Sequence, residues 1–353
     1  MDMRVKPSRR QAAVKPEVKT VNLALQGGGA HGAFAWGVLD RLIEDGRIRF
    51  EGISATSAGA MNAAVLAHGW TVGGPDGARE ALESFWRAVS EAGQRWNPYR
   101  ALPWMSWLGE LPLELSPAYQ WMEYLTRVFS PYQLNPLNFN PLRDVLEAHV
   151  DFERLRRESA IKLYLCATNV QTCKVRIFSC ADVSADAVLA SACLPFMFQS
   201  VMVDGEPYWD GGYMGNPAIY PLIYECEARD VVIVHLNPIV RRGVPTTAGE
   251  ILNRLNEVSF NSSLMREMRA IVFVTGLIER GKLSSEEFKQ MLIHSIRADD
   301  VMSGYGAASK LNCDWSFLTE LRDAGRLHAG RWLEQHFGAL GVRSSVDLRG
   351  EFL

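Results

Sequence analysis

The sequence of 353 residues lacks the cysteine patterns that mark a disulfide framework or a metal site. Its six cysteines are scattered, with no CxxC pair and no histidine neighbours at metal-ligand spacing. Thiols used in this way are typical of a reducing compartment, so we expect a cytoplasmic location. Neither a metal ion nor a cofactor is expected.

An excess of charge of one sign is also missing. The net charge is -3, and 48% of the residues are hydrophobic and 22% charged, which is ordinary for a globular protein. A nucleic-acid-binding protein would need a basic patch, so nucleic acid is not an expected partner. Residues 1–19 are the exception, with six basic side chains against two acidic ones. No apolar segment follows them, so we predict a disordered basic arm rather than a secretory signal, with anionic lipid as the surface it would contact.

The sequence has no strongly apolar run of membrane-spanning length. Residues 52–75 contain no Asp, Glu, Lys or Arg, but 13 of these 24 residues are Gly, Ala or Ser. Such small side chains give too little hydrophobicity for a stable span and suit close packing inside a protein. We therefore predict a buried central helix here.

What the sequence does contain is a repeated unit of strand, tight turn and helix. Apolar residues at 21–25 end in glycines and are followed by helical spacing at 33–43. A short strand near 50–53 leads into the Ala-rich helix, which is predicted to end near Gly69. Further strands are predicted at 161–167, 175–179, 202–203 and 231–236. This alternation favours an α/β fold with a mostly parallel central sheet and helices on both faces.

A tryptophan-rich segment separates the second unit from the later strands. Residues 71–142 show no strand periodicity and contain Trp86, Trp96, Trp104, Trp107 and Trp121. We predict a mostly helical insertion, which is either a lid over the site or a structural layer over the sheet. Residues 20–240 then form the core. Residues 241–353, with helical spacing at 248–277 and 318–337, form a C-terminal helical region that packs on it.

The segment around Ser57 is the first of three motifs that carry chemistry. Ala55-Thr56-Ser57-Ala58-Gly59 stands between a predicted strand and a predicted helix. A serine on such a turn exposes its oxygen at the sheet edge, above the positive end of the helix. The usual pattern is G-x-S-x-G, so Ala55 is a departure that disfavours a positive φ at that position. A serine that merely caps the helix is the alternative.

Three successive glycines after the first strand form the second motif. Consecutive glycines allow backbone N–H groups to converge on one point, as a developing oxyanion requires. The same string fits the dinucleotide fingerprint G-x-G-x-x-G through Gly27, Gly29 and Gly32. That fingerprint needs an acidic residue at the end of the second strand, where this sequence has Ser-Ala-Thr-Ser. Glu51 precedes the core of that strand, so dinucleotide binding is disfavoured.

The third motif is Trp209-Asp210-Gly211-Gly212. An aspartate on a tight glycine loop can bring its carboxylate to another turn and accept the proton of a serine hydroxyl directly. A plain turn aspartate is the alternative.

In this order, the three motifs resemble the patatin-like phospholipase family. The likeness covers residues 20–240, and Ala190-Ser191 followed by Pro195 adds to it. The resemblance implies a three-layer α/β/α fold and a lipid acyl hydrolase that cleaves carboxylic esters through an acyl-enzyme. The expected substrate is a phospholipid, a lysophospholipid or another fatty-acyl ester, met in part at a membrane or lipid surface.

The same resemblance implies roles for individual residues. Ser57 would be the nucleophile, Asp210 the base, and the N–H groups of Gly28 and Gly29 the oxyanion hole. The N–H of Ala58, which follows the nucleophile, is a further candidate donor on the grounds of elbow geometry.

His31 is a second departure, because the family usually has Arg or Lys at this position of the glycine motif. An imidazole that titrates near neutral pH would then lie beside the oxyanion hole, and we expect His31 to influence the site in a pH-dependent way. A Ser-His-Asp triad is an alternative, because four histidines that could serve it follow Ser57: His235, His294, His328 and His336.

Two other functions stay open at this stage. Acyl transfer on a related architecture would use G-H-S-x-G, but Thr56 occupies the position of that histidine. A lipid-binding protein with a damaged site is the non-enzyme alternative, and Ala55 and His31 are the departures that suggest it.

Overall fold

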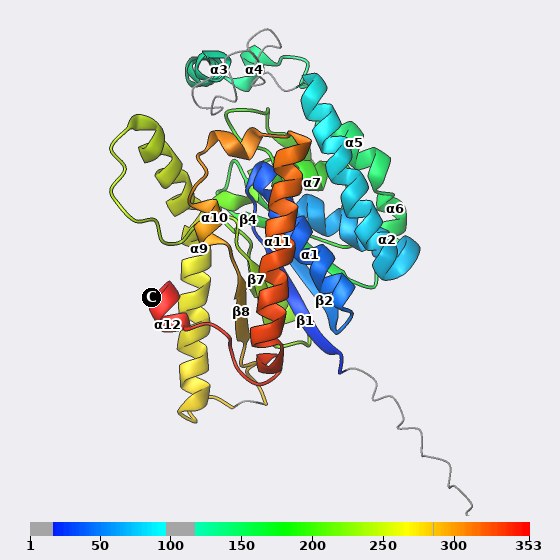
Figure 1. Ribbon diagram of the computed structural model, residues 1–353, viewed down its shortest axis with the longest axis vertical. Helices are drawn as coiled ribbons and strands as arrows, with labels where there is room; N and C mark the ends of the chain where they lie inside the picture. Colours follow the sequence, from blue (N-terminus) through cyan, green and yellow to red (C-terminus); the bar gives the residue numbers. More distant parts are fainter. Residues whose placement is uncertain (1–16, 97–116, 285) are drawn as a thin grey trace, which may run out of the picture.

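An eight-stranded sheet lies at the centre of the computed structural model, which describes residues 17–96, 117–284 and 286–353 (Figure 1). The strands are β1 (Lys19–Leu25), β2 (Ile48–Ala55), β3 (Lys162–Asn169), β4 (Val175–Ser179), β5 (Val201–Val203), β6 (Glu206–Asp210), β7 (Asp230–Val234) and β8 (Leu292–Ile296). Their order across the sheet is β5-β6-β3-β2-β1-β7-β8, and β4 also pairs with β3. The pairs from β3 through β2, β1 and β7 to β8 are parallel, whereas β4, β5 and β6 pair antiparallel. The sheet is therefore mostly parallel, as predicted.

Helices cover both faces of this sheet. They are α1 (Gly32–Asp45), α2 (Ala58–Trp96), α3 (Pro117–Val128), α4 (Pro131–Leu134), α5 (Pro141–His149), α6 (Phe152–Glu158), α7 (Ala185–Ser191), α8 (Tyr220–Glu225), α9 (Ala248–Glu279), α10 (Asp299–Met302), α11 (Trp315–His336) and α12 (Leu348–Phe352). Successive residues of a strand face opposite sides. In β7, Val232 and Val234 belong to the hydrophobic cluster that includes α1, α2 and α11, whereas Val231 and Ile233 belong to the one that includes α8, α9 and α12. The predicted three-layer α/β/α fold is confirmed.

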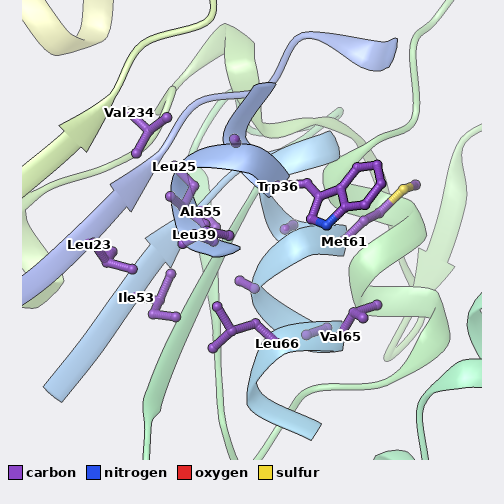
Figure 2. Close-up of a cluster of buried hydrophobic side chains, with 14 of the residues drawn as sticks. Leu23, Leu25, Trp36, Leu39, Ile53, Ala55, Met61, Val65, Leu66 and Val234 are labelled. Atoms are coloured by element: carbon purple, nitrogen blue, oxygen red, sulfur yellow. The ribbon is translucent and has the colours of Figure 1, made fainter. Parts of the chain in front are cut away.

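The larger hydrophobic cluster fills the space between β1, β2 and the helices α1 and α2 (Figure 2). Leu23, Leu25 and Ile53 from the strands are completely buried, as are Leu39 of α1 and Leu66 of α2. Full burial of one such side chain contributes roughly 1.5–3 kcal/mol relative to exposure. The small residues at the start of α2 lie in this interior too, as predicted. In the described part of the chain, no helix combines the length and the apolar character that crossing a membrane requires.

The helix α2 continues well past the predicted end near Gly69. It runs to Trp96 but contains two residues with non-helical dihedral angles, Gly73 and Gly74, directly before Pro75. Gly74 has a φ of +63°, a value that favours glycine, and proline is well tolerated where a helix restarts. The glycines therefore produce a kink between two helical halves, a few residues beyond the predicted end near Gly69.

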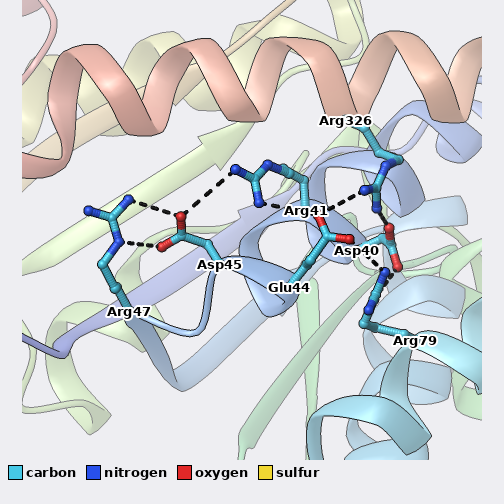
Figure 3. Close-up of polar contacts among 7 residues, drawn as sticks. All are labelled: Asp40, Arg41, Glu44, Asp45, Arg47, Arg79 and Arg326. Carbon is cyan, nitrogen blue, oxygen red and sulfur yellow. Dashed lines mark hydrogen bonds and ion pairs between the residues drawn. The ribbon is translucent and has the colours of Figure 1, made fainter. Parts of the chain in front are cut away.

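Ion pairs join α11 and the second half of α2 to α1 (Figure 3). Arg79 of α2 donates through Nε to Asp40 Oδ1 at 2.7 Å and through Nη2 to Glu44 Oε1 at 3.1 Å. Arg326 of α11 pairs with the same two carboxylates, at 2.8 Å from Nη2 to Glu44 Oε2. Isolated pairs of this exposure contribute little. Two arginines that share two carboxylates nevertheless connect three helices, so α11 is attached to the first strand-turn-helix unit.

Two strands were not predicted from the sequence. The strand β6 forms a hairpin with β5 through the two-residue turn of Asp204 and Gly205, whose φ values of +52° and +82° suit the twist of such a hairpin. The strand β8 extends the parallel sheet beyond β7 and lies within a region predicted to be helical. It contains the completely buried polar residue His294, which interrupts its apolar pattern.

Candidate active site

Ser57 lies on a strained turn between β2 and α2. Its φ is +57°, a left-handed conformation that costs a non-glycine residue about 1–2 kcal/mol. The Ser57 N–H donates to the hydroxyl of Ser191 at 2.9 Å, which holds the turn in place. The N-cap residue of an ordinary helix has extended dihedral angles, so the positive φ favours a nucleophile turn over a simple cap.

Ala55 was expected to alter this turn by disfavouring a positive φ, but the structure requires no positive φ at this position. It is the last residue of β2, where it pairs with Leu25 and Leu165, and the positive φ falls on Ser57 instead. The turn instead requires a small residue after Ser57, at Gly59. A Cβ at Gly59 would lie 2.4 Å from the carbonyl oxygen of Leu25.

The glycine turn after β1 lies directly beside the serine turn. A Cβ at Gly27 would lie 2.6 Å from the Cβ of Ser57, so the contact requires glycine. Gly29 has a φ of +58°, and a Cβ there would lie 2.4 Å from the carbonyl oxygen of Lys310. The N–H of Gly27 donates to Asn216 Oδ1 at 2.7 Å. The N–H groups of Gly28 and Gly29 have no acceptor among the described residues.

Asp210 approaches these turns from β6. It is the last residue of that strand and pairs with Ala167 of β3, so the predicted tight loop begins after the aspartate rather than around it. The strand pairing fixes its position more firmly than a loop would. The carboxylate is completely buried, and its Oδ1 accepts the Gly212 N–H at 2.7 Å. Its Oδ2 accepts no hydrogen bond from any residue that the structure describes.

Burial gives this carboxyl group a high proton affinity. Desolvation raises the pKa of Asp210 from 3.8 to about 6. The Gly212 N–H, the Ser57 hydroxyl and the Lys310 ammonium each act to lower this pKa, and so limit the rise. Asp210 is therefore ionised at neutral pH but accepts a proton more readily than an exposed aspartate, and the Ser57 hydroxyl is close enough to interact with it.

A cavity of about 1550 Å³ opens over the three motifs. Ser57, Asp210, Gly28, Gly29 and Ala58 all line it, so it brings together the predicted site residues with the exception of His31. The rest of its wall is mainly apolar and includes Met61, Phe85, Trp86, Leu142 and Phe198.

Part of the tryptophan-rich segment borders this cavity. Trp86 of α2 lines it, and residues of α3 and α4 contribute to its wall. Trp121 of α3 is not among the lining residues and is 62% exposed. Trp104, Trp107 and the side chain of Trp96 lie outside the described residues. The described part of the segment is mostly helical and contributes to the cavity wall.

His31 lies behind the glycine turn and not in the cavity wall. Its Nε2 is 2.8 Å from the Ser309 hydroxyl, and its ring packs against Tyr305 and Phe317 at centroid distances of 5.6 and 6.3 Å. Burial, with a smaller contribution from the charge of Lys310, lowers the pKa of His31 to about 3. The imidazole is therefore neutral at physiological pH, and the expected titration near neutrality is wrong.

Further polar residues hold the glycine turn, and their role was not predicted from the sequence. Gln26 Oε1 accepts the N–H groups of Leu236 and Asn237 at 2.9 and 3.1 Å. Asn237 Nδ2 donates to the Gly27 carbonyl at 2.8 Å, and Lys310 Nζ donates to Asn237 Oδ1 at 2.9 Å. Asn237 follows the carboxyl end of a parallel strand, as Ser57 does, and this position was an available signal. No motif marks Lys310.

The histidines considered for a triad contact other groups. His235 Nε2 lies 3.1 Å from the Ser295 hydroxyl. His294 Nε2 lies 2.9 Å from Asp230 Oδ1, and its Nδ1 lies 3.1 Å from the Ser345 hydroxyl. Asp230 is the first residue of β7, so the row of Asp230, His294 and Ser345 lies at the opposite end of the sheet from Ser57. The two candidates on α11 pack against aromatic rings. The described contacts place none of the four beside Ser57.

Glu51, the acidic residue considered for dinucleotide binding, is occupied by other contacts. Glu51 lies within β2, where Oε1 accepts Lys162 Nζ at 3.0 Å and the carboxylate also accepts the backbone N–H groups of Glu227 and Ala228. A carboxylate with these partners is not available for a ribose. Across residues 17–96, 117–284 and 286–353, no group of three or more His, Cys, Asp or Glu side chains is placed to hold a metal ion.

Comparison with known proteins shows which family the sequence matches. The sequence matches the patatin-like phospholipase family over residues 23–223. Similar solved structures include VipD from Legionella pneumophila, with 15% identity and a TM-score of 0.35, where the match covers 90% of this chain and 72% of VipD. They also include ExoU from Pseudomonas aeruginosa in complex with SpcU, with 15% identity and a TM-score of 0.34. That match covers 90% of this chain and 53% of ExoU, so the chain spans about half the length of ExoU. A search of curated proteins finds no match.

Proposed function

The chain belongs to the patatin-like phospholipase family, and on this basis we propose that it hydrolyses lipid esters through a dyad of Ser57 and Asp210. Family membership supports lipid hydrolysis in general. One observation carries the dyad: Ser57 on its left-handed turn and Asp210 with an oxygen that lacks a hydrogen bond from any described residue line the same cavity. The proposed activity is of the phospholipase A or lysophospholipase type.

In the proposed reaction, the ester carbonyl oxygen accepts hydrogen bonds from the N–H groups of Gly28 and Gly29, with Ala58 as a further donor. Ser57 Oγ attacks the carbonyl carbon while Asp210 Oδ2 accepts the hydroxyl proton. The tetrahedral intermediate then breaks its bond to the alcohol, which leaves with that proton. Water attacks the acyl-enzyme, transfers a proton through Asp210 to Ser57, and releases the fatty acid.

The surroundings of Asp210 support its use as a base without a histidine. An exposed aspartate is too weak a base to take the proton of a serine efficiently at neutral pH. Burial raises the pKa of Asp210 to about 6, which moves its proton affinity toward the operating range. The oxygen without a hydrogen bond leaves an acceptor position for the serine proton.

The cavity wall supports a fatty-acyl substrate. Ligand pockets that are mainly apolar with a few convergent polar groups bind apolar ligands in a defined orientation, and the dyad supplies those polar groups here. Beside the cavity, Trp121 and Tyr124 of α3 and Leu255 of α9 are 62%, 57% and 59% exposed. Large apolar side chains in this position support contact with a membrane or lipid surface that presents the substrate.

A fluorophosphonate probe and a p-nitrophenyl ester test this function directly. Wild-type protein should be labelled and should hydrolyse the ester, and Ser57→Ala should abolish both. Ser345→Ala is the matched control, because Ser345 contacts a histidine but lies at the opposite end of the sheet, and it should leave both unchanged. Labelling that survives in Ser57→Ala would place the nucleophile elsewhere. Lipid binding without labelling of the wild type would support the lipid-binding alternative, and transfer of the acyl group to an added alcohol would support acyl transfer.

A further inference from the structure

We propose that Lys310 is an electrostatic positioning residue of this site, whose ammonium group keeps Asp210 ionised and favours negative charge at the glycine turn. Lys310 lies in the C-terminal part of the chain and lines the same cavity as Ser57. This inference rests on the proposed function, because it gives Lys310 a part in the same reaction.

Both the backbone and the side chain of Lys310 make contacts at the glycine turn. Its backbone carbonyl oxygen occupies the space beside Gly29, where a Cβ would lie 2.4 Å from it. Its Nζ donates to Asn237 Oδ1 at 2.9 Å, and Asn237 in turn donates to the Gly27 carbonyl at 2.8 Å. An ammonium group has three donors, so this bond leaves further donors for the cavity. Lys310 is therefore held at the turn by both its backbone and its side chain.

The neighbouring charges leave Lys310 without a carboxylate of its own. Arg241 and Arg254 both pair with Glu257, at 2.7 and 2.9 Å, so two cations share that buried carboxylate. Lys310 forms no ion pair with any residue in the described part of the chain. A cation in partly dry surroundings with no paired anion favours any negative charge that develops nearby. Asp210 and the proposed oxyanion are the two such charges in this cavity.

The groups that face Lys310 agree with this role. They are Asp210 of β6, Glu257 of α9, Arg241 of the preceding loop and His31 at the glycine turn. The charge of Lys310 lowers the pKa of both Asp210 and His31. Burial lowers the pKa of Lys310 itself, whereas Glu257 and Asp210 raise it. Part of the side chain lines the cavity, and the acceptor Asn237 Oδ1 and the carboxylates of Glu257 and Asp210 favour the ammonium form against the effect of burial.

Two further titratable groups face Asp210 and do not compete with Lys310. Burial and the charge of Asp210 raise the pKa of Cys193 and of Tyr213 to about 12, so both stay neutral over the working pH range. Lys310 is thus the cation among the groups that set the ionisation of Asp210.

The test compares Lys310→Met, which removes the charge, with Lys310→Arg, which keeps it. The kcat, the KM and the pH profile of kcat/KM are measured for a p-nitrophenyl ester. Lys310→Met should lower kcat by about 10- to 100-fold with little change in KM, because the lost interaction acts on charge in the transition state. The acidic limb of its pH profile of kcat/KM should move to higher pH, since Asp210 loses the cation that favours its ionised form. Lys310→Arg should restore most of kcat, and the acidic limb should return to its position in the wild type.

Lys289→Met is the matched control, because Lys289 is likewise a partly buried lysine whose ammonium group donates a hydrogen bond, here to the Ile223 carbonyl, but it does not line the cavity. It should leave kcat and the limb unchanged. Lys310→Gln is a second neutral variant in case Lys310→Met does not fold, as judged by thermal melting. An unchanged limb and kcat in a folded neutral variant would overturn the proposal. So would equal impairment of Lys310→Arg, or failure of both neutral variants to fold, since each indicates a purely structural residue. If the wild type shows no activity that depends on Ser57, the proposed function itself is wrong.

Discussion

The two ends of the central sheet each bury an aspartate beside other polar groups, and they treat it differently. Where β7 and β8 begin, Asp230 Oδ1 accepts His294 Nε2 at 2.9 Å and the Gly341 N–H at 2.8 Å. The other nitrogen of His294 lies 3.1 Å from the Ser345 hydroxyl. At the carboxyl ends of β1 and β2, by contrast, Asp210 has an oxygen with no hydrogen bond from a described residue.

This difference separates a structural polar cluster from a candidate catalytic one. The row of Asp230, His294 and Ser345 has the residue types of a hydrolase triad, but its members satisfy one another, and none of them lines the large cavity. Asp210 and Ser57 do line this cavity, and Asp210 Oδ2 accepts no hydrogen bond from the described residues in the geometry of the structure. A buried polar group without a partner lowers stability, so its presence beside a cavity favours a functional reason for it.

Removal of the Asp210 charge is the change with the largest expected effect on this comparison. Asp210→Asn should lower kcat by about 10³-fold or more, yet raise the free energy of unfolding at pH 8 by up to about 3 kcal/mol. The folded pKa of about 6 lies above the ordinary 3.8, so this group's stabilising contribution is present below pH 3.8 and is lost as the pH rises through 6. Asparagine keeps an oxygen for the Gly212 N–H and removes the buried charge.

Urea unfolding at pH 5 and pH 8, together with ester hydrolysis, measures both effects. The stability gain should be larger at pH 8 than at pH 5. A variant that is equally inactive but less stable than the wild type at pH 8 would show that the Asp210 charge is satisfied after all, and the contrast between the two ends of the sheet would disappear.

The opposite result is expected at the other end of the sheet. Asp230→Ala leaves His294 Nε2 and the Gly341 N–H without their acceptor and should lower the free energy of unfolding by about 2–4 kcal/mol. The kcat per folded molecule should stay within about twofold of the wild type, because the change is remote from the cavity. Ser345→Ala, which removes a partly exposed hydroxyl, is the milder comparison. A large loss of kcat in folded Asp230→Ala would give this polar row a catalytic role.

Local chemistry explains which parts of the fold and the site were predictable. The strand, turn and helix around Ser57 and the glycine turn follow from small residues and apolar spacing within a few positions, and both were predicted with their sheet type and layers. The strands β6 and β8 were not, because β6 contains Pro207, which local propensity disfavours in a strand, and β8 contains the buried polar residue His294. Their strand character comes from pairing with distant segments, which local propensity does not encode.

The surroundings of the predicted site residues were less accessible. Nothing near Gly29 in the sequence indicates that the Lys310 carbonyl packs on it. The titration expected for His31 was wrong for the same reason, since Tyr305, Phe317 and Ser309, which withdraw it from water, lie more than 270 positions further along the chain. Desolvation depends on tertiary contacts, so a residue type alone does not determine its pKa.

The smallest expected effect concerns His31 and sharpens the assignment of the pH dependence to Asp210. In the wild type, kcat/KM should rise with pH through a midpoint near 6, as the pKa of Asp210 requires for a base that acts in its ionised form. His31→Gln should leave that midpoint in place and change kcat by less than about threefold, because the imidazole is already neutral there. Glutamine can extend an amide to the Ser309 hydroxyl in place of Nε2, and thermal melting checks that the packing survives. If the limb instead moved or vanished in His31→Gln, the imidazole would be titrating beside the glycine turn, and the buried carboxylate would no longer account for the pH dependence.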